Sequence, residues 1–215
     1  MSGYGALLHR NGQSGNYNGK HGRLVLKICG VLLAAGAARR FGGGKLLHAL
    51  GDGTPLGVAA ARNLLQALPD VVAVVRPGDD ALAALLKNAG CEVTVCADAV
   101  HGMGHSLAHA IAARRDADGW VIALADMPSI RPATIGAVAQ AIADGAVLAA
   151  PAIDGKRGHP VGIAGRFRDD LLALTGDAGA RDIIAAHRHE LKMVASDDAG
   201  CLLDIDRPED LPPVD

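Results

Sequence analysis

The sequence predicts a single α/β domain whose mostly parallel sheet carries helices on both faces. Short apolar runs alternate with amphipathic helical stretches along most of the chain, which is the pattern of repeated strand–helix units. The strand-like runs are apolar almost throughout, as expected for strands that are buried on both faces. With 215 residues, 50% of them hydrophobic, the chain is long enough for one sizeable core. We therefore expect a Rossmann-like three-layer domain.

The alternation assigns each element in turn. The expected strands are residues 26–32, 71–75, 91–96, 120–125, 146–150, 161–164, 191–195 and 201–205. The expected helices are residues 54–68, 79–89, 105–114, 131–143, 169–174 and 180–187. Pro55 and Pro132 suit the first turns of their helices, and Gly90 suits the end of the second. Residues 1–23 are rich in Gly, Asn, Ser and His without apolar periodicity, so we expect a flexible N-terminal tail followed by one domain over residues 24–215.

Composition excludes several classes of function. The formal net charge is −2, so no strong field steers the chain to nucleic acid, and 2% aromatic residues are too few for a base-stacking platform. No apolar stretch reaches membrane-spanning length without interruption. The cysteines form no C-x-x-C pair, which favours buried free thiols in a reducing cytosol. We therefore expect a cytoplasmic protein that binds neither nucleic acid nor membrane. Cys91 and Cys96 should point to opposite faces of one strand.

The loop after the first strand predicts a phosphate-binding site. Its sequence, L-A-A-G-A-A-R-R-F-G-G-G-K, covers residues 33–45. Small residues let an anion approach backbone N–H groups closely, and Arg39, Arg40 and Lys45 add the cations that a polyphosphate needs. A solvent-exposed glycine-rich turn is the alternative explanation.

The two commonest phosphate loops do not fit this segment. A P-loop needs Ser or Thr after Gly-Lys, whereas Leu46 follows Lys45. A dinucleotide fingerprint needs G-x-G-x-x-G and an acidic residue roughly 20 residues further on. The glycines are spaced differently here, and the second strand is followed by Arg76. The missing acid disfavours a nucleotide-dependent oxidoreductase.

An aspartate stands directly after the predicted strand 120–125. In the sequence L-A-D-M-P, the strand holds Asp126 at a fixed height above the sheet. A carboxylate in that place suits Mg²⁺, which binds one or two carboxylates together with substrate phosphates. It equally suits a turn or helix-capping aspartate, and position alone leaves both roles open.

Three histidines recur every four residues. On one helix, His101, His105 and His109 would form a metal site on one face. Gly102 and Gly104 argue against a helix before His105, so the three rings need not align. Capping and surface exposure explain these histidines adequately.

Two later segments carry charged residues beside predicted strands. Residues 154–161, D-G-K-R-G-H-P-V, by themselves predict a hairpin turn with exposed basic side chains. Residues 203–211, L-D-I-D-R-P-E-D-L, alternate Asp204, Ile205 and Asp206, which on a strand places both carboxylates on one face. Asp206 also suits the cap of the short helix that follows.

These motifs together resemble the MobA-like nucleotidyltransferases, with particular similarity to the molybdenum-cofactor cytidylyltransferases. The signature L-A-[AG]-G-x-x-x-R-x-G-x-x-K is met at every fixed position of residues 33–45. The family elements G-M-x-x-S-[LI], L-A-D-M-P, G-x-R-G-H-P-V, G-D-x-G-A-R and L-D-I-D-x-P-E-D-L follow in order, so the resemblance covers residues 26–211. It implies the nucleotide-diphospho-sugar transferase type of fold.

The resemblance also implies a set of site residues. Those implied to bind the nucleotide are Leu33, Ala34, Ala35, Gly36, Arg39, Arg40, Lys45, Gly102 and Ser106. Arg40, Lys45 and Asp126 are implied to be catalytic, and Asp126 and Asp206 to bind Mg²⁺, with Mn²⁺ as the alternative. Those implied to bind the acceptor are Arg157, His159 and Arg181.

The reaction implied is transfer of CMP from CTP to the phosphate of molybdenum-bound molybdopterin, with release of pyrophosphate. The partners implied are this small-molecule acceptor and a molybdoenzyme that receives the cofactor. Ala35 favours CTP, because guanylyltransferases of this fold more often carry L-A-G-G. A guanylyltransferase, a sugar- or alditol-phosphate nucleotidyltransferase and a non-catalytic cofactor chaperone remain alternatives.

Overall fold

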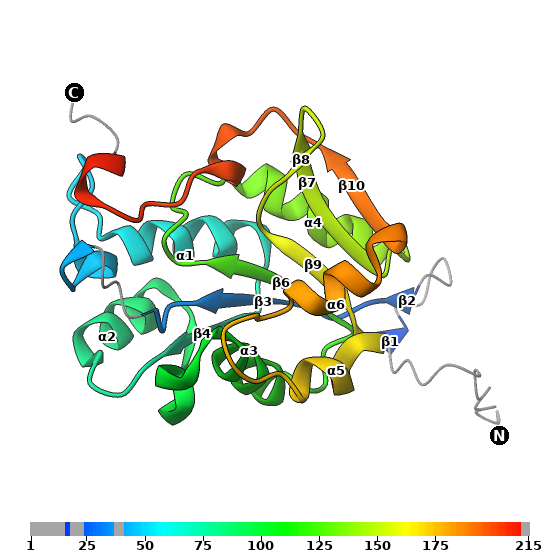
Figure 1. Cartoon of the computed structure of the whole chain (residues 1–215), viewed down its shortest axis with the longest axis horizontal. Helices are drawn as coiled ribbons and strands as arrows, with labels where there is room; N and C mark the ends of the chain where they lie inside the picture. Colours follow the sequence, from blue (N-terminus) through cyan, green and yellow to red (C-terminus); the bar gives the residue numbers. More distant parts are fainter. Residues whose placement is uncertain (1–15, 18–23, 37–40, 212–215) are drawn as a thin grey trace, which may run out of the picture.

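The computed structural model describes residues 16–17, 24–36 and 41–211. The strands of its main sheet are β3 (Ile28–Leu33), β4 (Val71–Val75), β5 (Glu92–Val95), β6 (Gly119–Leu124), β7 (Leu148–Ile153), β8 (Lys156–Arg157), β9 (Val161–Ala164) and β10 (Leu191–Ala195). The α-helices are α1 (Leu56–Ala67), α2 (Asp80–Ala89), α3 (Met103–Ala113), α4 (Pro132–Ala143), α5 (Arg168–Leu172) and α6 (Arg181–Ala186). The strand–helix alternation is thus confirmed (Figure 1).

The main sheet is mostly parallel, as predicted. Its strand order is β10-β7-β9-β6-β3-β4-β5, with β8 paired to β7. The pairs β10–β7, β6–β3, β3–β4 and β4–β5 are parallel, whereas β9 runs antiparallel to both of its neighbours. From β3 the chain moves to β4 and β5, and then crosses back to β6 on the other side of β3. The loops after β3 and β6 therefore leave the sheet at a topological switch point, where open α/β sheets bind ligands.

Helices cover both faces of the sheet. Residues of α1, α2 and α4 pack in one core cluster, and residues of α3, α5 and α6 pack in the other. Figure 1 shows α1 and α4 on one side of the sheet and α3 and α5 on the other. Cys91 lies in the first cluster and Cys96 in the second, which confirms the opposite facing expected from their odd spacing.

The last expected strand, over residues 201–205, is wrong. This segment begins as a short 3₁₀ helix, Ala199–Leu202, whose start is capped by Asp198 accepting a hydrogen bond from the Gly200 N–H. Beyond it, the Ile205 N–H donates to the carbonyl of Asp126 at 3.0 Å instead of joining a strand ladder. Of the apolar residues that suggested a strand, Cys201 and Ile205 are buried, whereas Leu202 and Leu203 are exposed, because the segment crosses the carboxyl edge of the sheet.

Part of the predicted tail takes part in a small sheet. The strand β1 (Asn16–Tyr17) pairs antiparallel with β2 (Leu24–Val25). The other residues of 1–23 lie outside the described part of the chain, so the expected flexible tail and the boundary at residue 24 stay predictions. Across the residues described, no helix combines the length and the apolar character needed to cross a membrane.

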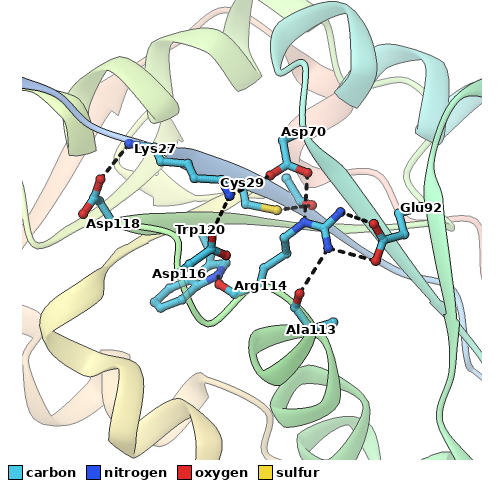
Figure 2. A network of polar contacts seen from close by, with 10 residues as sticks. Lys27, Cys29, Asp70, Glu92, Ala113, Arg114, Asp116, Asp118 and Trp120 are labelled. Carbon is cyan, nitrogen blue, oxygen red and sulfur yellow. Dashed lines mark hydrogen bonds and ion pairs between the residues drawn. The ribbon is translucent and has the colours of Figure 1, made fainter. Parts of the chain in front are cut away.

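A polar network ties the amino-terminal ends of the strands together (Figure 2). The Arg114 guanidinium, at the end of α3, donates to Asp70 at 2.9 Å and to Glu92 at 2.6 Å, so it links the beginnings of β4 and β5. The backbone carbonyl of Arg114 accepts a hydrogen bond from the Trp120 indole N–H at 3.2 Å. Lys27 lies 3.8 Å from the same Asp70 carboxylate. This edge is opposite to the ligand-binding edge, so the network serves the fold.

Replacing the central arginine tests the contribution of this network to stability. Arg114→Met should lower the free energy of unfolding by about 2 kcal/mol, because it removes charged hydrogen bonds from a side chain that is only 14% exposed. Urea unfolding followed by circular dichroism measures the change. The exposed neighbour Arg115 offers a matched control, since Arg115→Met should shift stability by less than about 0.5 kcal/mol. Equal effects of the two substitutions would contradict the role given to Arg114.

Candidate active site

A lysine and two aspartates meet at the carboxyl edge of the sheet. The Lys45 Nζ lies 2.8 Å from Oδ2 of Asp126 and 3.4 Å from Oδ1 of Asp206. The lysine side chain is 8% exposed, whereas Asp126 and Asp206 are 25% and 36% exposed. Residues widely separated in the sequence are thus brought together as a cation between two carboxylates.

Local structure explains how Lys45 reaches this position. It begins the short 3₁₀ helix Lys45–Leu47, directly after Gly44 with a φ of 64°. Gly42 and Gly43 also have positive φ values, 84° and 96°, which residues with a side chain rarely adopt. The glycine run is therefore required by the backbone turn that leads into the lysine.

The backbones of the two aspartates are held in place by hydrogen bonds. Asp126 lies two residues after the end of β6. Its carbonyl accepts a hydrogen bond from the Ile205 N–H, which anchors the segment 201–205 beside it. The Asp210 carboxylate accepts from the N–H groups of Asp206 at 3.0 Å and Arg207 at 2.8 Å. Asp210, and not Asp206, therefore caps this turn. The Asp206 side chain instead contacts the lysine.

The donor set fits a hard divalent cation that is completed by its substrate. Mg²⁺ binds one or two carboxylates and takes its remaining oxygens from water and phosphates, which matches a pair of aspartates beside a phosphate loop. Elsewhere in the described residues, no cluster of three or more His, Cys, Asp or Glu side chains could hold a metal ion.

The three regularly spaced histidines form no metal site. Although α3 begins at Met103, earlier than predicted, His101 precedes it in a separate 3₁₀ turn. The His101 and His105 rings contact each other edge-on at 5.8 Å, while His109 lies 2.7 Å from the Thr94 hydroxyl. The sequence left the alignment of these rings open, and the structure places His109 on Thr94, apart from the contact between His101 and His105.

A cavity of about 670 Å³ opens between the loops, and Asp126 is among the residues that line it. Five of the predicted nucleotide-binding residues line it: Leu33, Ala35, Gly36, Gly102 and Ser106. Ala34 does not, because it is 1% exposed and packs in the core. Arg39 and Arg40 lie outside the described residues. Lys45 does not line it either, and of the lysine–aspartate cluster only Asp126 does, so this carboxylate connects the cluster to the cavity.

Two charged residues in this cavity were missed by the sequence interpretation. Arg76 follows β4 and lines the cavity, with its Nε donating to Asp79 at 2.9 Å. Asp177 lines the opposite side, although its turn was expected on the acceptor side. The position of Arg76 directly after a central strand was the available signal, and it had been used only to exclude a dinucleotide site.

The glycines at the start of α3 are explained by close packing. A Cβ at Gly102 would lie 2.3 Å from the backbone of Gly176, and one at Gly104 would lie 2.5 Å from the Thr175 carbonyl. The Gly104 N–H donates to the Gly176 carbonyl at 2.7 Å. Gly104 thus lies inside the helix, contrary to the prediction, because no larger residue fits beneath this turn.

A second cavity, of about 180 Å³, adjoins the first. All three predicted acceptor-binding residues line it: Arg157, His159 and Arg181. Leu33, Met103 and Leu124 line both cavities and separate them. The basic hairpin and the turn before α6 thus meet beside the nucleotide cavity, as a donor site and an acceptor site would.

His159 is held as a neutral imidazole. Its pKa is lowered from 6.5 to about 4, chiefly by burial and also by the charge of Arg157, while Asp126 and Asp204 oppose the shift. Its Nδ1 is buried and has no hydrogen-bond partner among the described residues. A ring in this state adds no positive charge to the acceptor cavity at neutral pH.

This shift makes a prediction about stability and pH. Between pH 6.5 and about 4 the unfolded chain binds the proton more readily, so the histidine's contribution is present above pH 6.5 and is lost as pH falls. From pH 7.5 to pH 5, the wild type should lose about 2 kcal/mol more than His159→Gln. Urea unfolding at each pH measures this difference. His101→Gln, at a histidine 64% exposed, should leave the pH dependence unchanged. A wild-type profile identical to that of His159→Gln would contradict the buried neutral state.

The fold and this paired-cavity site are those of an α/β protein of the nucleotidyltransferase class. A family model described as the MobA-like NTP transferase domain matches residues 30–191. The chain therefore belongs to the MobA-like NTP transferase family, as the sequence motifs indicated.

Relatives and solved structures agree with this assignment. Purine catabolism protein PucB of Bacillus subtilis is 30% identical over 197 residues, which cover 85% of this chain and 93% of PucB. Nicotine blue oxidoreductase of Paenarthrobacter nicotinovorans is 29% identical over 192 residues, covering 86% and 94%. Rv0371c of Mycobacterium tuberculosis has a crystal structure that superposes with a TM-score of 0.75 at 28% identity, covering 86% of this chain and 95% of Rv0371c. Another structure of Rv0371c is a complex with manganese.

Proposed function

We propose that this protein transfers CMP from CTP to the phosphate of molybdenum-bound molybdopterin and releases pyrophosphate. The observation that carries the proposal is the cluster of Lys45, Asp126 and Asp206, in which Asp126 also lines a cavity large enough for a nucleotide. A basic second cavity adjoins it, where an anionic acceptor would lie. Family membership supports the nucleotidyl transfer, and the L-A-A-G sequence at Ala35 supports CTP over GTP.

The residues present suit in-line substitution at the α-phosphorus. An oxygen of the acceptor phosphate forms a bond to this phosphorus, while the bond to the bridging oxygen of the pyrophosphate breaks. Negative charge grows on the leaving group, where Lys45 would neutralise it together with the predicted Arg40. A divalent ion on Asp126 and Asp206 would supply charge neutralisation and orient the triphosphate.

No general base is needed for this reaction. A phosphate monoester carries an ionised oxygen at neutral pH, so the nucleophile needs no side chain to remove a proton. The neutral state of His159 agrees with this chemistry, because its role would be contact with the acceptor. Arg157 and Arg181 would bind the acceptor's phosphate in the cytoplasm, and the product would then pass to a molybdoenzyme.

A panel of nucleotides tests the proposal. The purified protein is incubated with molybdenum-bound molybdopterin, Mg²⁺ and CTP, GTP, ATP or UTP, followed by pyrophosphate detection and mass analysis of the product. Pyrophosphate release with CTP and a CMP adduct are expected. A GMP adduct would establish a guanylyltransferase instead. Tight cofactor binding without turnover would support a chaperone, and turnover only with a sugar or alditol phosphate would reassign the acceptor.

One relative favours a second candidate function. The name of the P. nicotinovorans protein describes an oxidoreductase acting on nicotine blue, at 29% identity to this chain. The same panel therefore includes nicotine blue with reduced nicotinamide nucleotides. Dye reduction without pyrophosphate release would favour the oxidoreductase and overturn the proposed transfer.

A further inference from the structure

The ammonium group of Lys45 contacts both carboxylates that would bind a divalent ion. We propose that Lys45 and the metal compete for Asp126 and Asp206, so that the metal binds tightly only when a polyphosphate draws the lysine away. This inference rests on the proposed metal role of the two aspartates. It adds an order of events, in which the metal binds weakly to the protein alone and tightly together with the nucleotide.

The distances make the competition direct. Lys45 Nζ lies 2.8 Å and 3.4 Å from oxygens of the two aspartates. A divalent ion would bind such oxygens at about 2.1 Å. An ammonium group held at its present position would then lie only a few ångströms from a doubly charged cation, where the repulsion is strong in a partly buried site. One cation must leave.

The lysine is the partner that is free to move. Asp126 is anchored through its carbonyl to Ile205, and the backbone at Asp206 is anchored to the Asp210 carboxylate. The lysine side chain, by contrast, has a flexible four-carbon stem. Moving the backbones of the two aspartates apart would break these hydrogen bonds, whereas rotating the lysine side chain leaves the backbone hydrogen bonds of the described residues intact.

A polyphosphate would supply the lysine with new partners. Asp126 and the small residues Ala35 and Gly36, which leave backbone open to an anion, all line the proposed nucleotide cavity. When phosphates lie beside Asp126, the ammonium can turn to them and no longer competes with the metal for the aspartates. By linkage, the metal must then raise the affinity for nucleotide by the same factor as nucleotide raises the affinity for metal.

Metal binding measured without turnover tests this competition. Mn²⁺ is titrated into the full-length protein without nucleotide, and free Mn²⁺ is measured by electron paramagnetic resonance. Lys45→Met should bind Mn²⁺ roughly tenfold more tightly than the wild type, within the usual range of coupling between sites. Lys45→Arg keeps the charge and should bind as weakly as the wild type. Lys27→Met makes the same change at the opposite edge of the sheet and should have no effect.

Each outcome separates this inference from the proposed function. Equal Mn²⁺ affinity in the wild type and Lys45→Met, with binding lost in Asp126→Asn, would overturn the competition and leave the metal site standing. Failure of Mn²⁺ to bind any variant, with or without CTP, would overturn the metal role itself. If Lys45→Met does not fold, wild-type protein with ¹³C-dimethylated lysines is titrated with Mg²⁺. The Lys45 signal, assigned by its loss in Lys45→Arg, should shift on saturation, and an unchanged signal overturns the inference.

Discussion

Asp126→Asn is expected to reduce turnover roughly 10³-fold or more, because a metal that orients and neutralises a triphosphate contributes several kcal/mol to the transition state. The amide keeps the shape of the carboxylate but removes its charge. The backbone carbonyl that binds Ile205 is unaffected, so the fold should stay intact. Pyrophosphate release with CTP, Mg²⁺ and the molybdopterin acceptor measures the loss, and a thermal melt checks folding.

Asp204 provides the matched control for this substitution. It lies two residues before Asp206 and is exposed, and the described contacts do not place it on Lys45. Asp204→Asn removes the same charge from the same edge and should retain most activity. If Asp126→Asn released pyrophosphate at the wild-type rate, the proposed role of Asp126 in binding the metal would be wrong, whatever the result for Asp204→Asn.

Lys45→Ala is expected to lower the turnover number roughly 10²-fold or more. The substitution removes a preorganised ammonium group that would stabilise the negative charge growing on the pyrophosphate. The loss should appear in the turnover number under saturating CTP, since the charge grows as the pyrophosphate departs. Steady-state kinetics with the cytidylyl acceptor measure it. This variant combines two opposite effects, because the same change should make the metal bind more tightly in the absence of nucleotide.

The exposed Lys87 in α2 serves as the control for the lysine substitution. Lys87→Ala removes one positive charge far from the carboxyl edge and should leave the turnover number unchanged. Near-normal turnover of Lys45→Ala would exclude a direct role of Lys45 in neutralising the leaving group. A loss confined to the Michaelis constant for CTP would assign it to nucleotide binding alone.

Local patterns predicted most of the fold and the main parts of the site. Strands such as Val71–Val75 were apparent because parallel strands buried on both faces are continuously apolar. Asp126 was apparent because a carboxylate directly after such a strand must lie at the ligand-binding edge. The motif resemblance placed Arg157, His159 and Arg181 on one side of the cleft, and they do line one cavity. Their role in binding an acceptor stays a prediction.

The errors arose where distant segments determine the local structure. Residues 201–205 show the apolar pattern of a strand, but their hydrogen bonds go to His159 and Asp126 across the edge of the sheet. Gly104 was taken as a helix breaker, whereas it is the close approach of Thr175 that requires a glycine there. Arg76 has no motif around it, so its place directly after β4 indicates the edge of the sheet but not its entry into the cavity. No periodicity or spacing carries such information, since it depends on which loops meet after folding.

The turn before α6 belongs to both halves of the site. Asp177 lines the first cavity, the proposed nucleotide site, and Arg181 lines the second, the proposed acceptor site, while Gly176 is packed against the start of α3. A substitution in this turn would therefore change the preferences for donor and acceptor together. Protein engineering aimed at one substrate should instead vary Ala97 for the nucleotide or Arg157 for the acceptor, because each lines a single cavity. In an evolving lineage, this turn would tend to link changes in the two specificities.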